Sequence, residues 1–319
     1  MRALAFVLCL FAPPAMADVA GVVNDHIRPG YARFAQATSD LAALDTCDAA
    51  ALQTGFQAAF DAWMAVAHLH LGPVEDDGRS LAIAFWPDPK SLGAKAQRGL
   101  LTGDPAALEP ERFAEQSVAA RGLMGLERLL YPAEPLSADP CPLIHATARD
   151  LARMATEVDL GWVAYGNALL TAGQPGNTLF LSDSEALQAL FTQLVAGLEF
   201  VADQRLDRPL GTFDKPHPER AEARASGRSL VNVALSLAAL RDLSAHLHPD
   251  SPLTLAAFDR AIALAAGLDD PALQGVADPQ GRLKVEILQQ AVRAVREVAL
   301  TEMVPALGVG LGFNAQDGD

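Results

Sequence analysis

The sequence predicts an all-α protein built from two helical-bundle halves packed together. Half of the residues are hydrophobic and only 6% are aromatic, and alanine and leucine dominate the apolar set, which is typical of helices. Apolar residues recur at three- and four-residue steps, as in amphipathic helices. The two halves are residues 18–175 and 176–319, and the boundary between them falls within a segment rich in Gly, Pro, Asn and Thr, 172–183. Two four-helix-bundle-like halves are the simplest architecture. An internal duplication would fit, although the halves show no convincing self-match.

In the first half, four amphipathic segments are predicted to be helical: 19–44, 49–71, 111–131 and 143–171. The first is expected to break near Arg28-Pro29-Gly30, and the second to end at Gly72-Pro73. Between the second and third helices, residues 75–92 are rich in turn signals and contain two large aromatic residues, Phe85 and Trp86. We expect an ordered irregular loop there, because side chains of this size are rarely left in water.

The second half contains four further predicted helices: 185–205, 219–248, 253–268 and 283–304. Ser182 or Asp183 can cap the first of them, and Pro249 ends the second. Residues 209–218 are expected to form a loop, and the glycine-rich tail is not expected to be helical.

Residues 1–17 have the pattern of a cleaved secretory signal peptide. Arg2 supplies a positive start, residues 3–12 are apolar, and Ala15-Met16-Ala17 matches an A-x-A cleavage site. The apolar stretch is too short to span a bilayer as a helix. We therefore expect a soluble, exported protein, periplasmic in a Gram-negative bacterium. No later segment is expected to be long and charge-free enough to cross a membrane.

The charge balance argues against two classes of partner. The chain has 24 Lys and Arg against 39 Asp and Glu, for a formal net charge of −15. Extensive contact with phosphates is therefore not expected, which excludes a typical nucleic-acid binder. An anionic lipid surface would also repel the protein.

Export changes how the cysteines are interpreted. Without Cys9 of the leader, Cys47 and Cys141 remain, an even pair in an oxidising compartment. This predicts one disulfide between them. The wide separation and the lack of a C-x-x-C motif do not predict a zinc site or a haem attachment site.

Histidine spacing gives only weak metal signals. His68 and His70 lie two apart, so on a helix they would point in different directions. Asp242 and His246 are four apart and could face one ion, although a histidine near a helix C-terminus is also favoured by the helix dipole. No nucleotide-binding loop, serine-hydrolase elbow or H-E-x-x-H motif is present.

Glu127 is the exceptional residue of the third predicted helix. In GLMGLERLLY it adjoins the apolar stripe formed by Leu126, Leu129 and Leu130. A carboxylate in such a place needs a partner or a shifted pKa. It is either a boundary residue paired with an arginine or part of a functional site.

Four stretches together resemble the imelysin family, which is named for its insulin-cleaving metallopeptidases. They are FDAWMAVAHLHLGPV (60–74), GRSLAIAFWPDP (78–89), ARGLMGLERLLYP (120–132) and LGVGLGFNAQDGD (307–319). The resemblance spans almost the whole mature chain. It implies an all-helical fold of two bundle-like halves with a site near their junction, and an association with iron or haem acquisition.

The family signature, G-x-H-x-x-E, aligns with residues 122–127, where Gly122 and Glu127 match it and Met124 stands at the histidine position. Methionine replaces the histidine, and a thioether is a poor ligand for zinc or ferric iron, though acceptable for copper(I) or haem iron. The resemblance therefore implies Glu127 as a site residue, and as a catalytic base only if the protein is an enzyme. The segment GRSLVNVALSL (227–237) resembles a second site segment, with Arg228 and Ser229 as candidates.

The expected pocket brings these segments together. We predict that Arg228 faces Glu127 across the junction of the halves and that the loop carrying Trp86 roofs the space between them. The residues expected to bind ligand are Gly122, Glu127, Arg228, Ser229, Trp86, Asp88 and Trp63, and those that could bind a metal are Glu127 and His68.

Two functional hypotheses remain. The first is a non-enzymatic periplasmic binding or accessory protein for iron, haem or copper, working with a metal or small-molecule ligand and other iron-uptake components. The second is a metallopeptidase that uses Glu127 with ligands from elsewhere, such as His68, His70 or Asp242. The methionine at position 124 favours the first. A plain interaction module is a third alternative.

Overall fold

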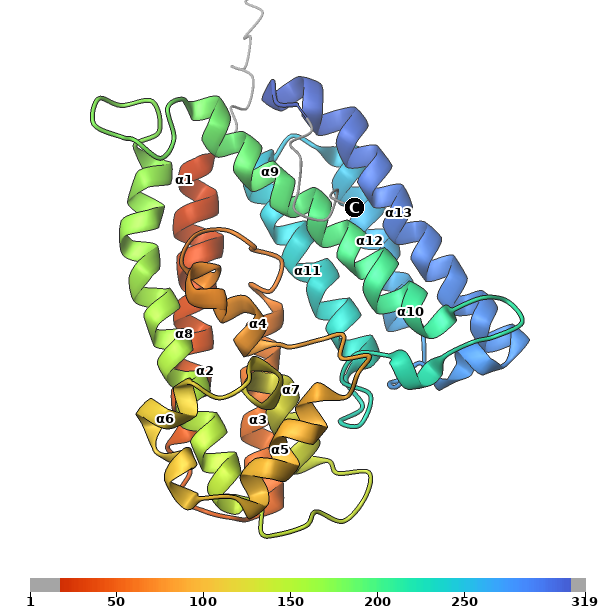
Figure 1. The fold of residues 1–319 in the computed structure, drawn as a ribbon. Coiled ribbons are helices and arrows are strands. Elements are labelled where there is room, and N and C mark those ends of the chain that lie inside the picture. Colours follow the sequence, from red (N-terminus) through yellow and green to blue (C-terminus); the bar gives the residue numbers. More distant parts are fainter. Residues whose placement is uncertain (1–17, 311–319) are drawn as a thin grey trace, which may run out of the picture.

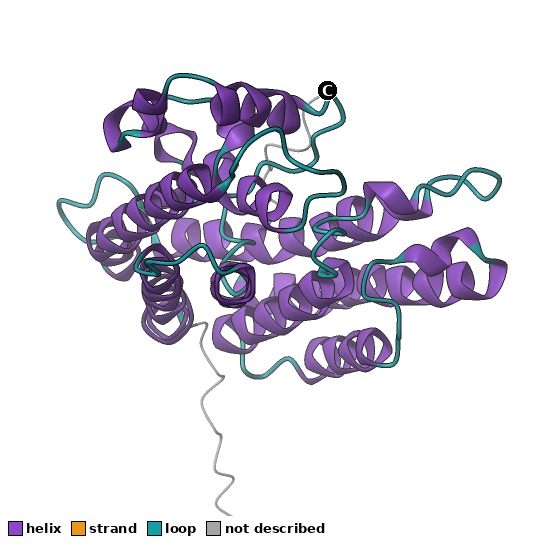
Figure 2. Ribbon diagram, turned by 90° about the horizontal axis from the view of Figure 1, so that it is seen from below, coloured by secondary structure: helices purple, strands orange, loops and turns teal. Residues whose placement is uncertain are grey.

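The computed structural model describes residues 18–310, and within that range it contains helices, turns and loops but no β-strand (Figures 1 and 2). The fold class is therefore all-α, as predicted. The leader, residues 1–17, and the end of the tail, residues 311–319, lie outside the described residues.

Three long helices form the frame of the first half. Helix α2 (Arg28–Ala42) packs against both α3 (Ala49–Met64) and α8 (Cys141–Leu170). Short elements complete this half: α1 (Val19–Gly21), the π-helix η1 (Val22–Ile27), η2 (Gly72–Val74), η3 (Asp76–Gly78), α4 (Arg79–Ile83), α5 (Leu92–Thr102), η4 (Pro105–Leu108), α6 (Pro110–Ala114), η5 (Val118–Ala120) and α7 (Gly122–Leu130). Helix α7 is held between α3 and α8.

The second half is built around the buried helix α11 (Ser229–Leu247), which contacts α9 (Asp183–Glu199) and α12 (Pro252–Ala266). Helix α13 (Pro279–Leu307) lies against α12 and α9 (Figure 1). The remaining elements are the π-helix η6 (Phe200–Leu206), α10 (Asp207–Leu210), η7 (Pro218–Arg220) and η8 (Gln274–Ala277).

Helix α11 joins the halves, because it contacts α1, η1 and α3 of the first half. The buried apolar side chains of both halves form one continuous core, so burial of this shared surface stabilises the halves against each other. The division near residue 175 stays a prediction.

The structure corrects several predicted boundaries. No break occurs at Arg28-Pro29-Gly30: the chain stays helical from the π-helix η1 into α2, and Pro29 directly follows the π-helical segment. The helix predicted over 49–71 ends at Met64, although Val66, Leu69 and Leu71 remain buried and prolong the apolar spacing.

The single helix predicted over 111–131 is three separate elements, α6, η5 and α7. Gly122 has a φ of 64°, and a Cβ there would collide with the carbonyl groups of Ala82 and Ile83. Only glycine fits this close approach of two chain segments. The helix predicted over 219–248 likewise begins only at Ser229, after a turn-rich segment.

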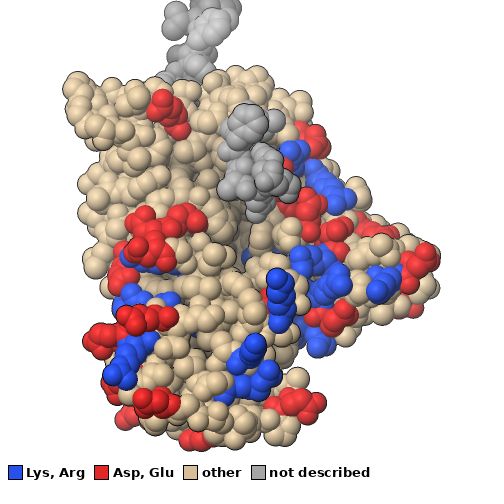
Figure 3. Space-filling model, in the orientation of Figure 1, with Lys and Arg blue, Asp and Glu red and all other residues tan. Residues whose placement is uncertain are grey.

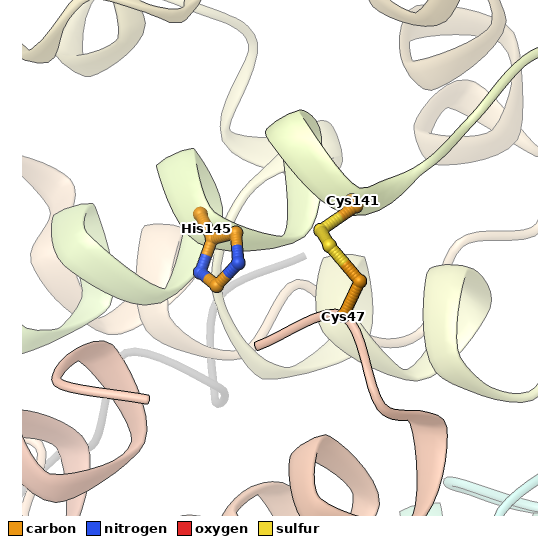
Figure 4. Close-up of side chains that lie close together, drawn as sticks. All are labelled: Cys47, Cys141 and His145. Carbon is orange, nitrogen blue, oxygen red and sulfur yellow. A yellow bond between two sulfur atoms is a disulfide. The ribbon is translucent and has the colours of Figure 1, made fainter. Parts of the chain in front are cut away.

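The predicted disulfide between Cys47 and Cys141 is present, with the two Cα atoms 5.7 Å apart (Figure 4). It joins the loop before α3 to the first residue of α8. The ring of His145 lies one turn further along α8, and a ligand atom of each of these three residues lies within 4.8 Å of the others. Both sulfurs are bonded to each other, so they are not free to bind a metal in this form.

One described helix, α11, is long and apolar enough to cross a membrane by length and composition. This corrects the expectation that no such segment follows the leader. However, 56% of its apolar window is buried inside the protein, and it packs on helices of both halves. Its apolar character is therefore accounted for by the core.

Candidate functional site

Glu127 lies on α7 with only 5% of its surface exposed. Its Oε1 accepts two hydrogen bonds from Ser226, one from the backbone N–H at 2.9 Å and one from the hydroxyl group at 2.7 Å. Burial raises the pKa of Glu127, and the two bonds from Ser226 partly oppose that rise. The carboxyl group is thus held in place by neutral donors.

A cavity of about 570 Å³ opens beside Glu127. Its walls come from four places: Met124, Glu127 and Arg128 of α7, the loop 86–91 with Ala94 of α5, Arg208 of α10, and the segment 219–225. These segments belong to both halves of the chain. The Trp86 loop and Glu127 thus border the same cavity, and their role in ligand binding stays a prediction.

Four arginines line this cavity: Arg128, Arg208, Arg220 and Arg224. Figure 3 shows lysine and arginine side chains gathered across the middle of this face, around the hollow between the halves. This concentration contrasts with the acidic excess of the whole chain. These four arginines were not predicted as site residues, because nothing local in the sequence indicates that α7, α10 and the segment 219–225 converge.

Arg228 does not pair with Glu127, and that prediction is wrong. Its Nη2 donates to Asp61 at 2.5 Å and its Nε to Asn232 at 3.2 Å, while the guanidinium lies over the ring of Phe60. Arg228 is only 3% exposed and does not line the cavity. It anchors α11 to α3, and Ser226, two residues earlier, makes the contact with Glu127.

Two residues of the loop 86–91, Trp86 and Asp88, have defined contacts. Trp86 packs edge-on against Phe200, and the guanidinium of Arg208 lies over its indole. Asp88 accepts hydrogen bonds from the backbone N–H groups of Leu92 and Gly93, at 2.9 and 2.8 Å. Its carboxylate therefore caps the start of α5 while facing the cavity.

Three other predicted site residues do not line the cavity. Gly122 meets the backbone carbonyls of the α4 segment and so fixes the position of α7. Trp63 is 5% exposed and packs against Phe34 in the core. Ser229 is buried at the first residue of α11, and its hydroxyl has no hydrogen-bond partner among the described residues.

His68 belongs to a separate polar cluster, in which the two histidines are buried and Asp242 is exposed. Its Nε2 lies 3.1 Å from Nε2 of His26, and Nδ1 of His26 lies 2.7 Å from Asp242. Asp242 thus pairs with His26 more closely than with His246, whose Nε2 is 3.7 Å from it. Among the described residues, no hydrogen bond or ion pair joins this cluster to Glu127, so His68 and Glu127 do not form one metal site.

The donor set around Glu127 does not fit a divalent or trivalent metal ion. Within the described range, no histidine or cysteine lines the cavity, and the nearest soft donor is the thioether of Met124. Glu127 already accepts two hydrogen bonds, and several guanidinium groups surround it. A bare cation would meet like charges and too few ligands.

A second, more apolar cavity of about 450 Å³ adjoins the first and shares the walls formed by Ala94, Arg128 and Ala225. It lies between α5 and the segment 131–137 after α7. The guanidinium of Arg128, which donates to Gln97 at 3.1 Å and to the carbonyl of Ala119, therefore stands between a charged and an apolar chamber.

The fold and cavity define a class: an all-helical protein with a cavity between its two halves that four arginines and three carboxylates line. The chain belongs to the imelysin family, whose model (Peptidase_M75, Imelysin) matches residues 27–299. No curated protein matches it.

Two solved structures share the fold. An imelysin-like protein from Psychrobacter arcticum 273-4 has 22% identity and a TM-score of 0.76, over 92% of this chain and 96% of that one. A protein named as a putative iron-regulated protein A precursor from Parabacteroides distasonis ATCC 8503 has 13% identity and a TM-score of 0.59, over 89% and 93%.

Proposed function

We propose that this chain is a periplasmic, non-enzymatic binding protein that serves iron acquisition and holds its ligand in the cavity beside Glu127. Family membership supports an imelysin-like role, and the name of the Parabacteroides protein links this fold to iron regulation. The disulfide between Cys47 and Cys141 is consistent with export, as is the leader pattern at residues 1–17.

The observation that carries the non-enzymatic interpretation is the environment of Glu127. A zinc peptidase needs three protein ligands and an open position where water is activated. Here Met124 takes the place of the signature histidine, and Ser226 occupies Oε1 of Glu127 with two hydrogen bonds. The carboxyl group is therefore placed to receive or position a ligand rather than to activate a metal-bound water.

The alternative, a metallopeptidase, is tested directly. Purified protein is incubated with casein and insulin B chain, with and without added zinc, and we expect no cleavage. Chelator-sensitive cleavage that disappears in Glu127→Ala would overturn the non-enzymatic proposal.

The iron role is tested in the bacterium that encodes the protein. Deleting the gene should lower uptake of radioactive iron under iron limitation. Restoring the wild-type gene should recover uptake, whereas a Glu127→Ala copy present at the same level in the periplasm should not. Equal uptake in the deletion strain and its parent would remove the iron role.

A further inference from the structure

The cavity beside Glu127 contains arginines whose charges are not paired. Among the described residues, no carboxylate lies within ion-pair distance of Arg128, Arg208 or Arg224, and Arg220 reaches Glu219 only at 3.9 Å. By contrast, the fully buried arginines of the described range, none of which lines the cavity, are paired, such as Arg121 with Asp150 at 2.7 Å and Arg205 with Glu222 at 2.7 Å. Arg128 and Arg208 are half-buried without an ion pair, which distinguishes them from these buried arginines, whereas Arg220 and Arg224 are exposed to solvent.

Arg208 carries the clearest sign of a missing partner. Its Nε is buried and has no hydrogen-bond partner among the described residues. Its Nη1 makes one weak contact, with Gln204 at 3.4 Å, and the guanidinium plane lies over Trp86. A buried unsatisfied donor on a cation is costly, and an anion in the cavity that Arg208 lines would offset this cost by pairing with the terminal nitrogens of the guanidinium.

The three carboxylates that line the cavity, Asp88, Glu127 and Glu219, are each engaged by other groups. Asp88 caps α5, Glu127 is held by Ser226, and Glu219 lies 2.8 Å from Nδ1 of His217. Arg128 likewise has neutral partners: its guanidinium donates to the side-chain oxygen of Gln97 and to the carbonyl of Ala119. Burial lowers the pKa of this guanidinium.

We propose that this cavity binds an organic anion carrying two or more carboxylate groups, held by Arg128, Arg208 and Arg224. Guanidinium groups pair with carboxylates through two parallel hydrogen bonds, which gives both affinity and orientation. These arginines come from three separate segments of the cavity wall, α7, α10 and 219–225, so an anion with several carboxylate groups offers each of them a partner. Such a polycarboxylate would bind either free or as its ferric complex.

This inference rests on the proposed binding function and names its ligand class. It also explains how an iron-linked protein can use a site that does not suit a bare metal ion, because a chelated iron presents its carboxylates to the protein. Free and iron-loaded polycarboxylates share that chemistry, so the experiment separates them.

Calorimetric titration of the full mature chain provides the test, with four probes: citrate, ferric citrate, inorganic phosphate and anaerobic ferrous chloride. We expect citrate or ferric citrate to bind, phosphate to bind at least about tenfold more weakly, and ferrous ion not to bind at the cavity. The affinity for citrate should fall as salt is raised. If citrate binds more tightly than ferric citrate, the ligand is the free polycarboxylate, and if ferric citrate binds more tightly, the ligand is the ferric complex.

Arg208→Gln should weaken this binding by about tenfold or more, as expected for the loss of a charge-assisted pair. Arg208→Lys keeps the charge but loses the two-pronged geometry of the guanidinium, so its affinity should lie between those of wild type and Arg208→Gln. The matched control is Arg241→Gln, an exposed arginine paired with Asp259 on the second half, which should bind like wild type. Melting curves of all variants show whether the fold is retained.

Three results would overturn the inference: no binding of either citrate form up to millimolar concentration, binding unchanged in both Arg208 variants and in Arg224→Gln, or ferrous ion binding that depends on Glu127. Failure here with a persistent iron-uptake defect would leave the iron role standing. Citrate binding in a strain without an uptake defect would keep the ligand class and remove the iron role.

Discussion

The carboxyl group of Glu127 combines burial with neutral donors, and this combination decides its chemistry. Burial disfavours the charged form by removing water, and Ser226 compensates only in part, so the pKa of Glu127 is raised. A folded-state pKa above the unfolded value means that folding becomes less favourable as the pH rises through that range. The protein therefore retains at this position a residue that costs stability at neutral pH.

Glu127→Gln should consequently be at least as stable as wild type at pH 7.5, because glutamine matches the shape of the protonated carboxyl group. The gain should shrink or vanish at pH 4, where wild-type Glu127 is also protonated. Urea unfolding at both pH values measures this. A variant that is markedly less stable at pH 7.5 would show that the carboxylate is structural.

Arg228 has a structural role, since its side chain is buried and does not line the cavity. It links Asp61 and Gln57 of α3 with Asn232 of α11 and stacks on Phe60. Arg228→Ala should lower the free energy of unfolding by about 2–3 kcal/mol, through lost hydrogen bonds and packing. Arg241→Ala removes an exposed pair with Asp259 and should cost less than about 1 kcal/mol. Equal losses in the two variants would contradict the anchoring role.

At the scale of elements, the position of α7 depends on Gly122 as well as on the apolar side chains of the helix. Apolar spacing predicted the helical character of 122–130 and the burial of Leu126 and Leu129. It could not show that the chain reverses at Gly122, because a positive φ and a close backbone approach leave no trace in periodicity. The pairing of Glu127 with Ser226 escaped for a related reason: residues 99 positions apart meet only through the fold.

Gly122→Ala tests this role of the signature glycine. The new Cβ would collide with two carbonyl groups of the α4 segment and would require a strained backbone, so we expect a loss of about 3 kcal/mol or more in unfolding free energy. Gly99→Ala is the control, because Gly99 lies within α5 and a Cβ added there would have no other atom within 4 Å. That variant should be neutral or more stable by up to about 1 kcal/mol. A tolerated Gly122→Ala would contradict this structural role.

At the scale of the whole molecule, the all-α class, the long helices near 143–171, 253–268 and 283–304, and the disulfide could be predicted from sequence. Each depends on local signals: periodicity, caps, or an even cysteine count after export. The arrangement of the halves depends on contacts across the junction, and those involve residues with no distinguishing pattern. His26 is an example: it lies in the π-helix η1, yet its partners are His68, 42 positions away, and Asp242, 216 positions away.

This histidine cluster predicts how the junction responds to acid. The pKa of His68 lies well below its ordinary value of 6.5, chiefly because of burial, with further lowering by His26, His70 and Arg205. The unfolded chain therefore takes up a proton near pH 6.5 that the folded protein does not. Stability is fully present above that pH and is lost as the pH falls below it, by up to about 1.4 kcal/mol per pH unit.

His68→Gln should remove this contribution, since the amide can still bond to Nε2 of His26 but does not titrate. Between pH 7.5 and pH 5.5 the unfolding free energy of wild type should drop by about 1 kcal/mol more than that of His68→Gln, as measured by urea unfolding at each pH. His217→Gln, on the loop beside Glu219, is the matched control and should keep the wild-type dependence. A parallel fall in wild type and His68→Gln would show that His68 accepts its proton in the folded state, and that the contact between η1, His68 and α11 is not the acid-sensitive part of the junction.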